Sequence, residues 1–168
     1  ISVQIEISNE YFLLIPQSYD SVTYRLGFLE KALGEHALVG KEIHVQPIEQ
    51  EGANLVFLVP SDWKDLISAH FPFAKIEYTH LLAKCLVKKE QQLTLFVFGN
   101  LAFASLYQSQ KLQLANVFPF ETPIELAFYL QSIRDAFSLN WNLYPPLLVE
   151  GSEEISDAHL YQIPYVSS

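Results

Sequence analysis

Several residue types are scarce in this chain of 168 residues, and each scarcity excludes a class of function. Cys85 is the single cysteine, so no internal disulfide can form, and we expect a reducing, cytoplasmic location. Ten lysines and arginines stand against 19 acidic residues, and the net charge of −9 disfavours binding to nucleic acid or to anionic membranes. No run of about 18 apolar residues occurs, so we expect no membrane span.

Methionine is absent, and the chain begins at Ile1 without a basic, cleavable leader. We therefore expect a piece of a longer polypeptide or a processed form. Apolar residues, in contrast, are plentiful. They make up 50% of the chain, and aromatic residues make up 14%, which is enough for a packed core in one domain or two small lobes.

The first third of the chain predicts two strands, a helix and a further strand. Residues 2–7 alternate apolar and polar side chains, and residues 11–15 form a second apolar run. A helix with one buried stripe is then predicted from apolar residues spaced three or four apart, namely Val22, Leu26, Leu29 and Leu33. Asp20 or Ser21 can cap its start and Gly34 its end. Pro47 places the next strand, 43–48, at a sheet edge.

Residues 55–60 form a continuous apolar run, which is typical of a strand buried in a parallel sheet. A helix capped by Ser61 should follow, with four apolar residues, Trp63, Leu66, Ile67 and Phe71. A strand at 75–78 and a helix at 80–87 come next, and this order predicts a parallel pair joined by a right-handed crossover. The polar break after these elements predicts two lobes, residues 1–88 and 89–168.

The second half predicts three strands in a row, at 93–98, 101–107 and 112–118, with Gly99 and Asn100 in the first turn. Thr122 and Glu125 then form a capping box around a proline, which predicts a helix to about residue 138. A short strand at 147–150 leads to Gly151 and Ser152, and a last helix is expected near Ser156. The predicted fold is α/β: a mixed sheet with a three-stranded antiparallel meander followed by a helix and a parallel strand, as in ribonuclease H-like lobes.

Three segments carry a resemblance to a known family: LVFLVPSDWKDLISAHFP, KLQLANVFPFETPIELAFYL and PPLLVEG. They resemble an uncharacterised bacterial family, known mainly from Bacteroidetes and described as having an actin-like ATPase fold. The likeness covers residues 11–165 and rests on apolar patterns rather than on a catalytic signature. It implies a partial first actin-like lobe, because relatives carry extra strands before the equivalent of Ile1, and a second ribonuclease H-like lobe.

In active actin-like ATPases, an Asp-x-Gly turn after the first strand of each lobe holds magnesium-bound phosphate. The residues here that match this turn are Val97, Phe98 and Gly99, so a valine replaces the metal-holding aspartate. The resemblance therefore implies a cytoplasmic interaction or scaffold protein with an unknown protein partner, without catalytic residues, metal or cofactor. A homodimer is compatible with the sequence, but nothing in the sequence requires one.

The alternative is an ATP-binding switch with Mg²⁺ and with weak or no hydrolysis. By analogy with the actin-like family, the residues that would contact the nucleotide are Gly99, Asn100, Gly151 and Ser152. An open cleft lined by backbone N–H groups beside the two glycines would favour this switch, and a site filled by Val97 and its neighbours would favour the scaffold.

Other chemistry finds weaker support in the sequence. A metal-dependent hydrolase needs at least three converging carboxylates or histidines, and the strand at 93–98 has none. A metal site from His70, Glu77 and His80 is conceivable, but these residues do not follow a known ligand spacing. Cys85 lies in an apolar stretch without an evident base, so we expect a buried residue rather than a nucleophile.

Two segments admit two interpretations each. The acidic residues Glu150, Glu153, Glu154 and Asp157 could bind a cation, although acids before a helix need no ligand and we favour that interpretation. The loop 140–146, with the sequence Asn-Trp-Asn-Leu-Tyr-Pro-Pro, could be an exposed surface that anchors a partner or a buried plug over the sheet end.

Overall fold

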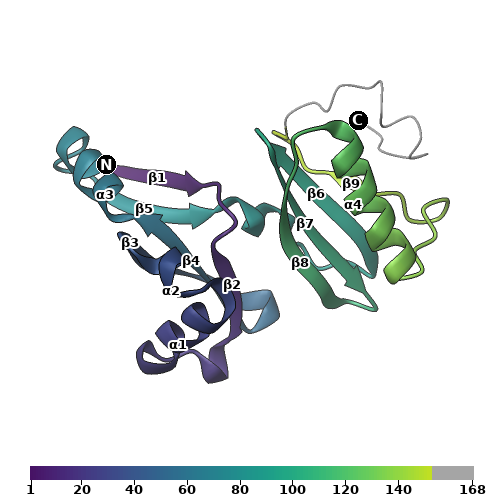
Figure 1. The fold of residues 1–168 in the computed structure, drawn as a ribbon, viewed down its shortest axis with the longest axis horizontal. Coiled ribbons are helices and arrows are strands. Elements are labelled where there is room, and N and C mark those ends of the chain that lie inside the picture. The colour runs from purple at the N-terminus through teal and green to yellow at the C-terminus, as the bar shows by residue number, and fades with distance from the viewer. Residues whose placement is uncertain (153–168) are drawn as a thin grey trace. The chain divides into compact units, whose positions relative to one another are not determined.

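The structure is a computed structural model that describes residues 1–152 (Figure 1). The chain divides into two compact units, Ile1–Ala83 and Lys84–Ser168. The helix expected near Ser156 and the acidic residues Glu153, Glu154 and Asp157 lie outside the described residues. The assignment of the two units to actin-like lobes stays a prediction.

The first unit contains a parallel pair of strands and an antiparallel sheet. The parallel pair consists of β1 (Ser2–Ile7) and β5 (Lys75–His80). The antiparallel sheet has the order β2 (Phe12–Pro16), β4 (Ala53–Pro60) and β3 (Lys41–Ile48). The strand that contains Pro47 therefore lies at a sheet edge, as its sequence predicts.

The predicted parallel crossover between residues 55–60 and 75–78 is wrong. Strand β4 runs antiparallel to both of its neighbours, and β5 pairs with β1 instead. An apolar run indicates burial on both faces but does not fix the direction of the neighbouring strands. Here Val56 and Leu58 pack in a cluster with Leu29, while the ring of Phe57 lies 5.4 Å from that of His80.

Helix α1 (Val22–Leu33) begins and ends as the sequence predicts. Ser21 Oγ accepts a hydrogen bond from the Tyr24 N–H at 3.3 Å, and Gly34 ends the helix with a φ of +84°. The predicted buried stripe is only partly correct, because Leu29 is fully buried whereas Val22 is 83% exposed and Leu26 is 45% exposed. The short helix α2 (Glu35–Leu38) follows.

Helix α3 (Ser61–His70) differs from its prediction at its start and on its surface. Ser61 is the first helical residue rather than the cap, and no side chain among the described residues caps the helix. Its apolar residues Trp63 and Leu66 are exposed.

The helix expected at 80–87 is also wrong. Strand β5 extends through His80 and leads into a 3₁₀ helix, η3 (Leu81–Cys85). Lys84 is the single charged residue in the segment 80–87, so the segment lacks the continuous polar face that distinguishes a surface helix from other buried conformations. Two more 3₁₀ helices, η1 (Gln17–Tyr19) and η2 (Glu49–Glu51), connect elements of the first unit.

The second unit has the predicted meander, helix and parallel strand. Its elements are β6 (Gln91–Phe98), β7 (Leu101–Gln108), β8 (Lys111–Pro119), α4 (Pro123–Ala136) and β9 (Leu147–Leu148). The sheet order is β8-β7-β6-β9, with β9 parallel to β6 (Figure 1). Helix α4 covers one face of this sheet and buries Leu126, Leu130 and Ile133 against it.

The start of α4 shows how closely local sequence can fix an element. Thr122 Oγ1 accepts a hydrogen bond from the Glu125 N–H at 3.3 Å, as a capping box requires. The return bond is shifted by one residue, because the Glu125 carboxylate accepts from the Glu121 N–H at 2.7 Å. Within residues 1–152, no helix is long and apolar enough to cross a membrane.

Candidate functional site

The four residues predicted to contact a nucleotide lie at one end of the second sheet. Gly99 and Asn100 form the turn that leaves β6 toward β7. Gly151 and Ser152 follow β9, which pairs with the opposite side of β6. Because β9 runs parallel to β6, the chain leaves both strands at the same end of the sheet.

Ser152 is bound to the backbone of β6 itself. Its Oγ accepts a hydrogen bond from the Val97 N–H at 2.7 Å, and its own N–H donates to the Val149 carbonyl at 3.1 Å. The Val149 N–H in turn donates to the Leu95 carbonyl at 2.8 Å. The Ser152 hydroxyl also donates to the Val97 carbonyl at 3.4 Å. These bonds continue the pairing of β9 with β6, so the Val97 N–H and the N–H and hydroxyl of Ser152 are all bonded within the sheet.

The side chain of Val97, the residue that the resemblance matches to the aspartate of active actin-like ATPases, lies in the core. It is 2% exposed and packs in the same cluster as Leu126 and Leu130 of α4. A valine side chain has no oxygen with which to hold a metal-bound water. Burial of this position explains the apolar residue, because a carboxylate there would lose its hydration.

The two glycines have turn conformations that disfavour other residues. Gly99 has a φ of +57° and Gly151 a φ of +84°. A Cβ on Gly151 would lie 3.9 Å from the Phe96 ring, an ordinary contact, so backbone conformation rather than space favours glycine here. Asn100 accepts a hydrogen bond from the Phe120 N–H at 2.9 Å through its carbonyl, which holds the turn to the end of β8.

Cys85 is a buried structural residue, as its sequence context predicts. Its thiol donates to the Phe103 carbonyl at 3.3 Å, and its own carbonyl accepts from the Ser105 hydroxyl. Burial raises the pKa of the Cys85 thiol to about 12, so the reactive thiolate is strongly disfavoured.

The structure gives His80 a structural role. It is 1% exposed, its Nε2 donates to the Asn9 carbonyl at 3.0 Å, and its Nδ1 accepts from the Leu82 N–H at 3.2 Å. These bonds require the neutral ring. Burial lowers its pKa to about 4.

The metal site considered from His70, Glu77 and His80 is therefore not assembled. His70 bonds the Leu66 carbonyl at 2.8 Å at the end of α3, and Glu77 pairs with Lys75. Residues 1–152 contain no group of three or more histidine, cysteine or acidic side chains placed to hold a metal ion.

The aromatic loop before β9 combines both interpretations of its sequence. Trp141 is 5% exposed and packs in the core under α4, with the Arg134 guanidinium 5.4 Å from its ring. Leu143 and Tyr144 are exposed. Trp141 is thus part of a buried plug over the sheet, whereas Leu143 and Tyr144 face solvent.

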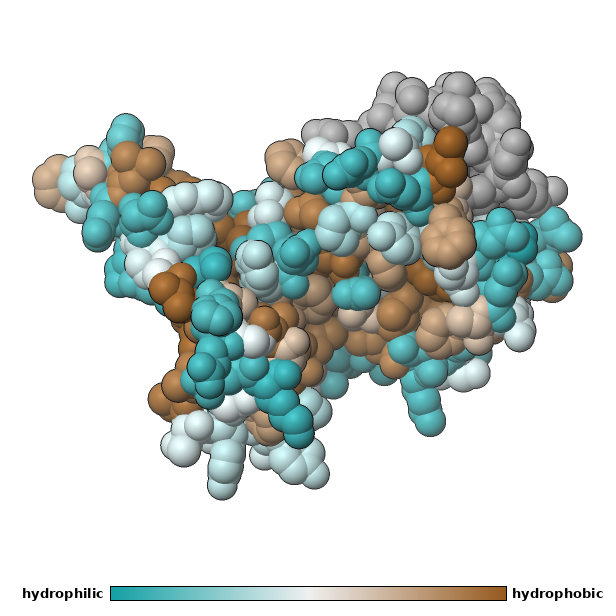
Figure 2. All heavy atoms as spheres, viewed as in Figure 1, coloured by the Kyte–Doolittle hydropathy of each residue, from teal (hydrophilic) through white to brown (hydrophobic). Residues whose placement is uncertain are grey.

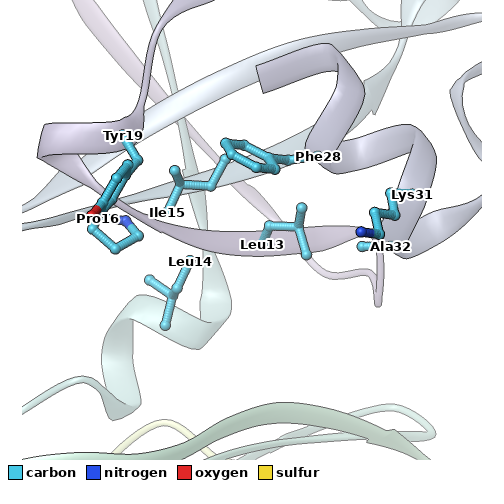
Figure 3. Close-up of a pocket in the computed structure, with 8 residues that line it drawn as sticks. All are labelled: Leu13, Leu14, Ile15, Pro16, Tyr19, Phe28, Lys31 and Ala32. Atoms are coloured by element: carbon cyan, nitrogen blue, oxygen red, sulfur yellow. The ribbon is translucent and has the colours of Figure 1, made fainter. Parts of the chain in front are cut away.

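An apolar groove beside β2 was not predicted from the sequence. Its volume is about 460 Å³, and β2, η1 and α1 supply the lining residues: Leu13, Leu14, Ile15, Pro16, Tyr19, Phe28, Lys31 and Ala32 (Figure 3). The sequence signal for this groove was Phe28, an apolar residue of α1 that lies outside the predicted buried stripe.

A hydrogen-bonded ion pair fixes the wall of this groove. Arg25 donates to both carboxylate oxygens of Asp20 at 2.8 Å, and the Asn54 side chain donates to Asp20 Oδ2 at 2.7 Å. The Asp20 side chain is fully buried, and its bond to Arg25 holds its pKa below the usual range. These bonds tie the start of α1 to β4.

Comparison with solved structures identifies the fold as that of actin-like ATPases, as the resemblance predicts. The chain is similar to a protein of Bacteroides thetaiotaomicron with an actin-like ATPase fold and unknown function, with a TM-score of 0.73 and 13% identity. The match covers 96% of this chain and 64% of that structure, so the chain spans less than two thirds of its length.

Residues 2–163 match the family described as "Protein of unknown function (DUF3822)", and the chain belongs to this family. The comparison with curated proteins finds no match.

Proposed function

We propose that this chain is a non-catalytic protein-interaction module built on an actin-like fold. The observation that carries the proposal is the environment of Val97. Its side chain is buried and its N–H is bonded to Ser152 Oγ. By resemblance, it stands in place of the aspartate that holds the metal in active actin-like ATPases. The fold alone does not define the function, so this step is an analogy supported by the burial of Val97.

Exposed apolar side chains of the first unit support an interaction role. The first group surrounds α1 and consists of Tyr19, Val22, Tyr24, Leu26 and Phe28. The second lies on α3 and the residues after it and consists of Trp63, Leu66, Phe71 and Phe73. Figure 2 shows such brown, apolar side chains at the surface among hydrophilic ones. Large apolar and aromatic residues gathered at a surface are typical of sites that bind proteins.

The partner should be a protein in the cytoplasm. The net charge of −9 disfavours nucleic acid, and a single buried thiol is compatible with a reducing compartment.

The decisive experiment is a calorimetric titration of the full native protein with Mg-ATP. We expect no heat beyond dilution, because the Val97 N–H and the N–H and hydroxyl of Ser152 are bonded within the sheet. Micromolar binding would contradict the proposal, above all if Gly151→Val abolished it while the variant retained the circular dichroism spectrum of the native protein.

An ATP-binding switch is the second candidate, and one observation favours it. Gly99 and Gly151, both with positive φ, lie at the same end of the sheet, where two glycine turns could approach a nucleotide. In that case Gly99, Asn100, Gly151 and Ser152 would contact ATP, and Ser152 would have to release Val97 on binding. Mg-ATP should then accelerate hydrogen exchange of the Val97 amide, whereas the interaction role predicts no change.

A further inference from the structure

Strand β2 has one edge without a neighbouring strand among the described residues. On its other edge, the Tyr11 carbonyl accepts from the Leu58 N–H at 3.0 Å and the Gln17 N–H donates to the Gly52 carbonyl at 2.9 Å. Hydrogen bonding alternates along an antiparallel strand, so residues 11, 13, 15 and 17 direct their backbone groups toward β4. The backbone N–H and C=O of Phe12 and Leu14 therefore point away from the sheet.

The apolar groove lies along this same strand. Leu13 and Ile15 lie on the side of β2 that faces Phe28 of α1, and Leu14 points to the opposite side (Figure 3). A peptide paired with β2 would also direct successive side chains to opposite sides. The groove can thus accept every second side chain of such a peptide, while the backbone groups of Phe12 and Leu14 bind its main chain.

The charge of the residues that line the groove indicates which kind of peptide it would bind. Of the eight residues that line the groove, Lys31 alone is charged, and it makes no hydrogen bond or ion pair within the described part of the chain. An acidic side chain next to the apolar ones would be attracted to its ammonium group. Strand β2 itself contains no carboxylate, so a second copy of this strand would not provide this charge.

We propose that the free edge of β2 binds an extended segment of a partner protein, with alternating apolar side chains and a carboxylate that pairs with Lys31. The segment becomes an additional strand of the sheet, since main-chain hydrogen bonds provide affinity and the groove selects the side chains. The inference rests on the proposed interaction role and names its site and the chemistry of the partner.

The test uses the full native protein and a short fluorescent peptide of alternating valine and threonine with one glutamate. We expect saturable binding in fluorescence anisotropy, at least about tenfold tighter than for a peptide of the same composition whose valines form one block. Amide hydrogen exchange provides the geometric readout. The Phe12 and Leu14 amides should exchange rapidly in the free protein and become protected by the peptide, whereas Leu13 and Ile15 should be protected in both states.

Matched variants separate the contributions of backbone, side chain and charge. Leu14→Pro removes an outward-pointing N–H without breaking the hydrogen bonds between β2 and β4. Leu14→Ala also removes the leucine side chain but keeps this N–H. The proline variant should therefore bind the peptide at least about tenfold more weakly than the alanine variant. Phe28→Ser should weaken binding of the peptide. Tyr24 lies on the same helix but outside the groove, so Tyr24→Ser should leave this binding unchanged. Lys31→Glu should prefer a peptide with lysine in place of its glutamate.

Three results would overturn the proposal: no binding of the alternating peptide, slow exchange of the Phe12 and Leu14 amides in the free protein, or a concentration-dependent dimer that Leu14→Pro dissociates. The first means that the edge does not bind strands, the second that the chain itself covers it, and the third that a second copy does. The Mg-ATP titration remains separate. If the titration shows heat from the binding of Mg-ATP and the peptide also binds, the result would contradict the proposed function but support this site.

Discussion

Ser152 Oγ accepts a hydrogen bond from the backbone N–H of Val97 at 2.7 Å, across the junction between β9 and β6. This bond connects the glycine turn after β9 to the residue that the resemblance matches to the metal-holding aspartate of active actin-like ATPases. The Ser152 hydroxyl also donates to the Val97 carbonyl at 3.4 Å, so the side chain of Ser152 is used as both acceptor and donor within the sheet. Its contribution to the free energy of unfolding can be measured directly.

Ser152→Ala should lower the free energy of unfolding by about 1 kcal/mol, because the Val97 N–H loses its acceptor in a partly buried setting. Urea unfolding measures this loss, and the Val97 amide should exchange faster. Ser132→Ala is the control, since Ser132 donates to the Phe128 carbonyl on the exposed side of α4 and its loss should have little effect. Equal stabilities of the native protein and Ser152→Ala would show that this bond does not stabilise the junction.

Introducing an aspartate at position 97 should not create an active site. Val97→Asp buries a carboxylate within an apolar cluster and should lower the free energy of unfolding by about 3 kcal/mol or more. Phe98→Asp is the control, because the adjacent Phe98 is 48% exposed and its replacement should cost much less. Release of phosphate from Mg-ATP should stay at background in both variants. A stable Val97→Asp protein that hydrolyses ATP would show that the site needs only this residue.

The elements with strong local signals were predictable from the sequence. Thr122, Pro123 and Glu125 determine the start of α4, and Gly99 with Asn100 determines the first turn of the meander, because each signal acts within a few residues. The strand order of the first unit was not predictable. The apolar residues of β4 indicate that it is buried, but its antiparallel neighbours are selected by contacts distant in sequence, such as Phe57 with His80.

The candidate site was predictable as a set of positions but not as a set of contacts. The order of strands brought Gly99 and Gly151 to one end of the sheet. The bond from Val97 to Ser152 depends on the register of β9 against β6, which only the structure reveals. The groove beside β2 escaped prediction for a related reason: Phe28 lies outside the predicted buried stripe of α1, but only the fold places it beside Leu13 and Ile15.

His80 should make the protein less stable in mild acid. Its pKa is about 4 in the folded protein, against 6.5 for an ordinary histidine, so the unfolded chain binds the proton more readily. The stabilisation from the neutral ring is fully present above pH 6.5 and is lost as the pH falls toward 4. Between pH 7.5 and pH 5 this one group should remove about 2 kcal/mol from the free energy of unfolding.

Urea unfolding at the two pH values measures this effect, and His80→Gln isolates it. The glutamine variant should lack this part of the pH dependence, whereas His36→Gln, at an exposed position, should retain it. Other titrating groups remain in both variants, so their contributions cancel in the difference. A His80→Gln protein with the full pH dependence would contradict the assignment of the neutral, buried ring.

Two leucine substitutions distinguish apolar side chains that stabilise the fold from apolar side chains that are exposed. Leu29 of α1 is fully buried with Val56 and Leu58 against the antiparallel sheet, whereas Leu66 of α3 is 60% exposed. Leu29→Ala should lower the free energy of unfolding by about 3 kcal/mol, through lost contacts and a residual cavity. Leu66→Ala removes the same atoms but should cost about 0.5 kcal/mol or less, because that side chain remains largely in water in the folded state. Equal losses in urea unfolding would mean that the native protein already covers α3, and the apolar residues of this helix would then belong to its core rather than to a surface for a partner.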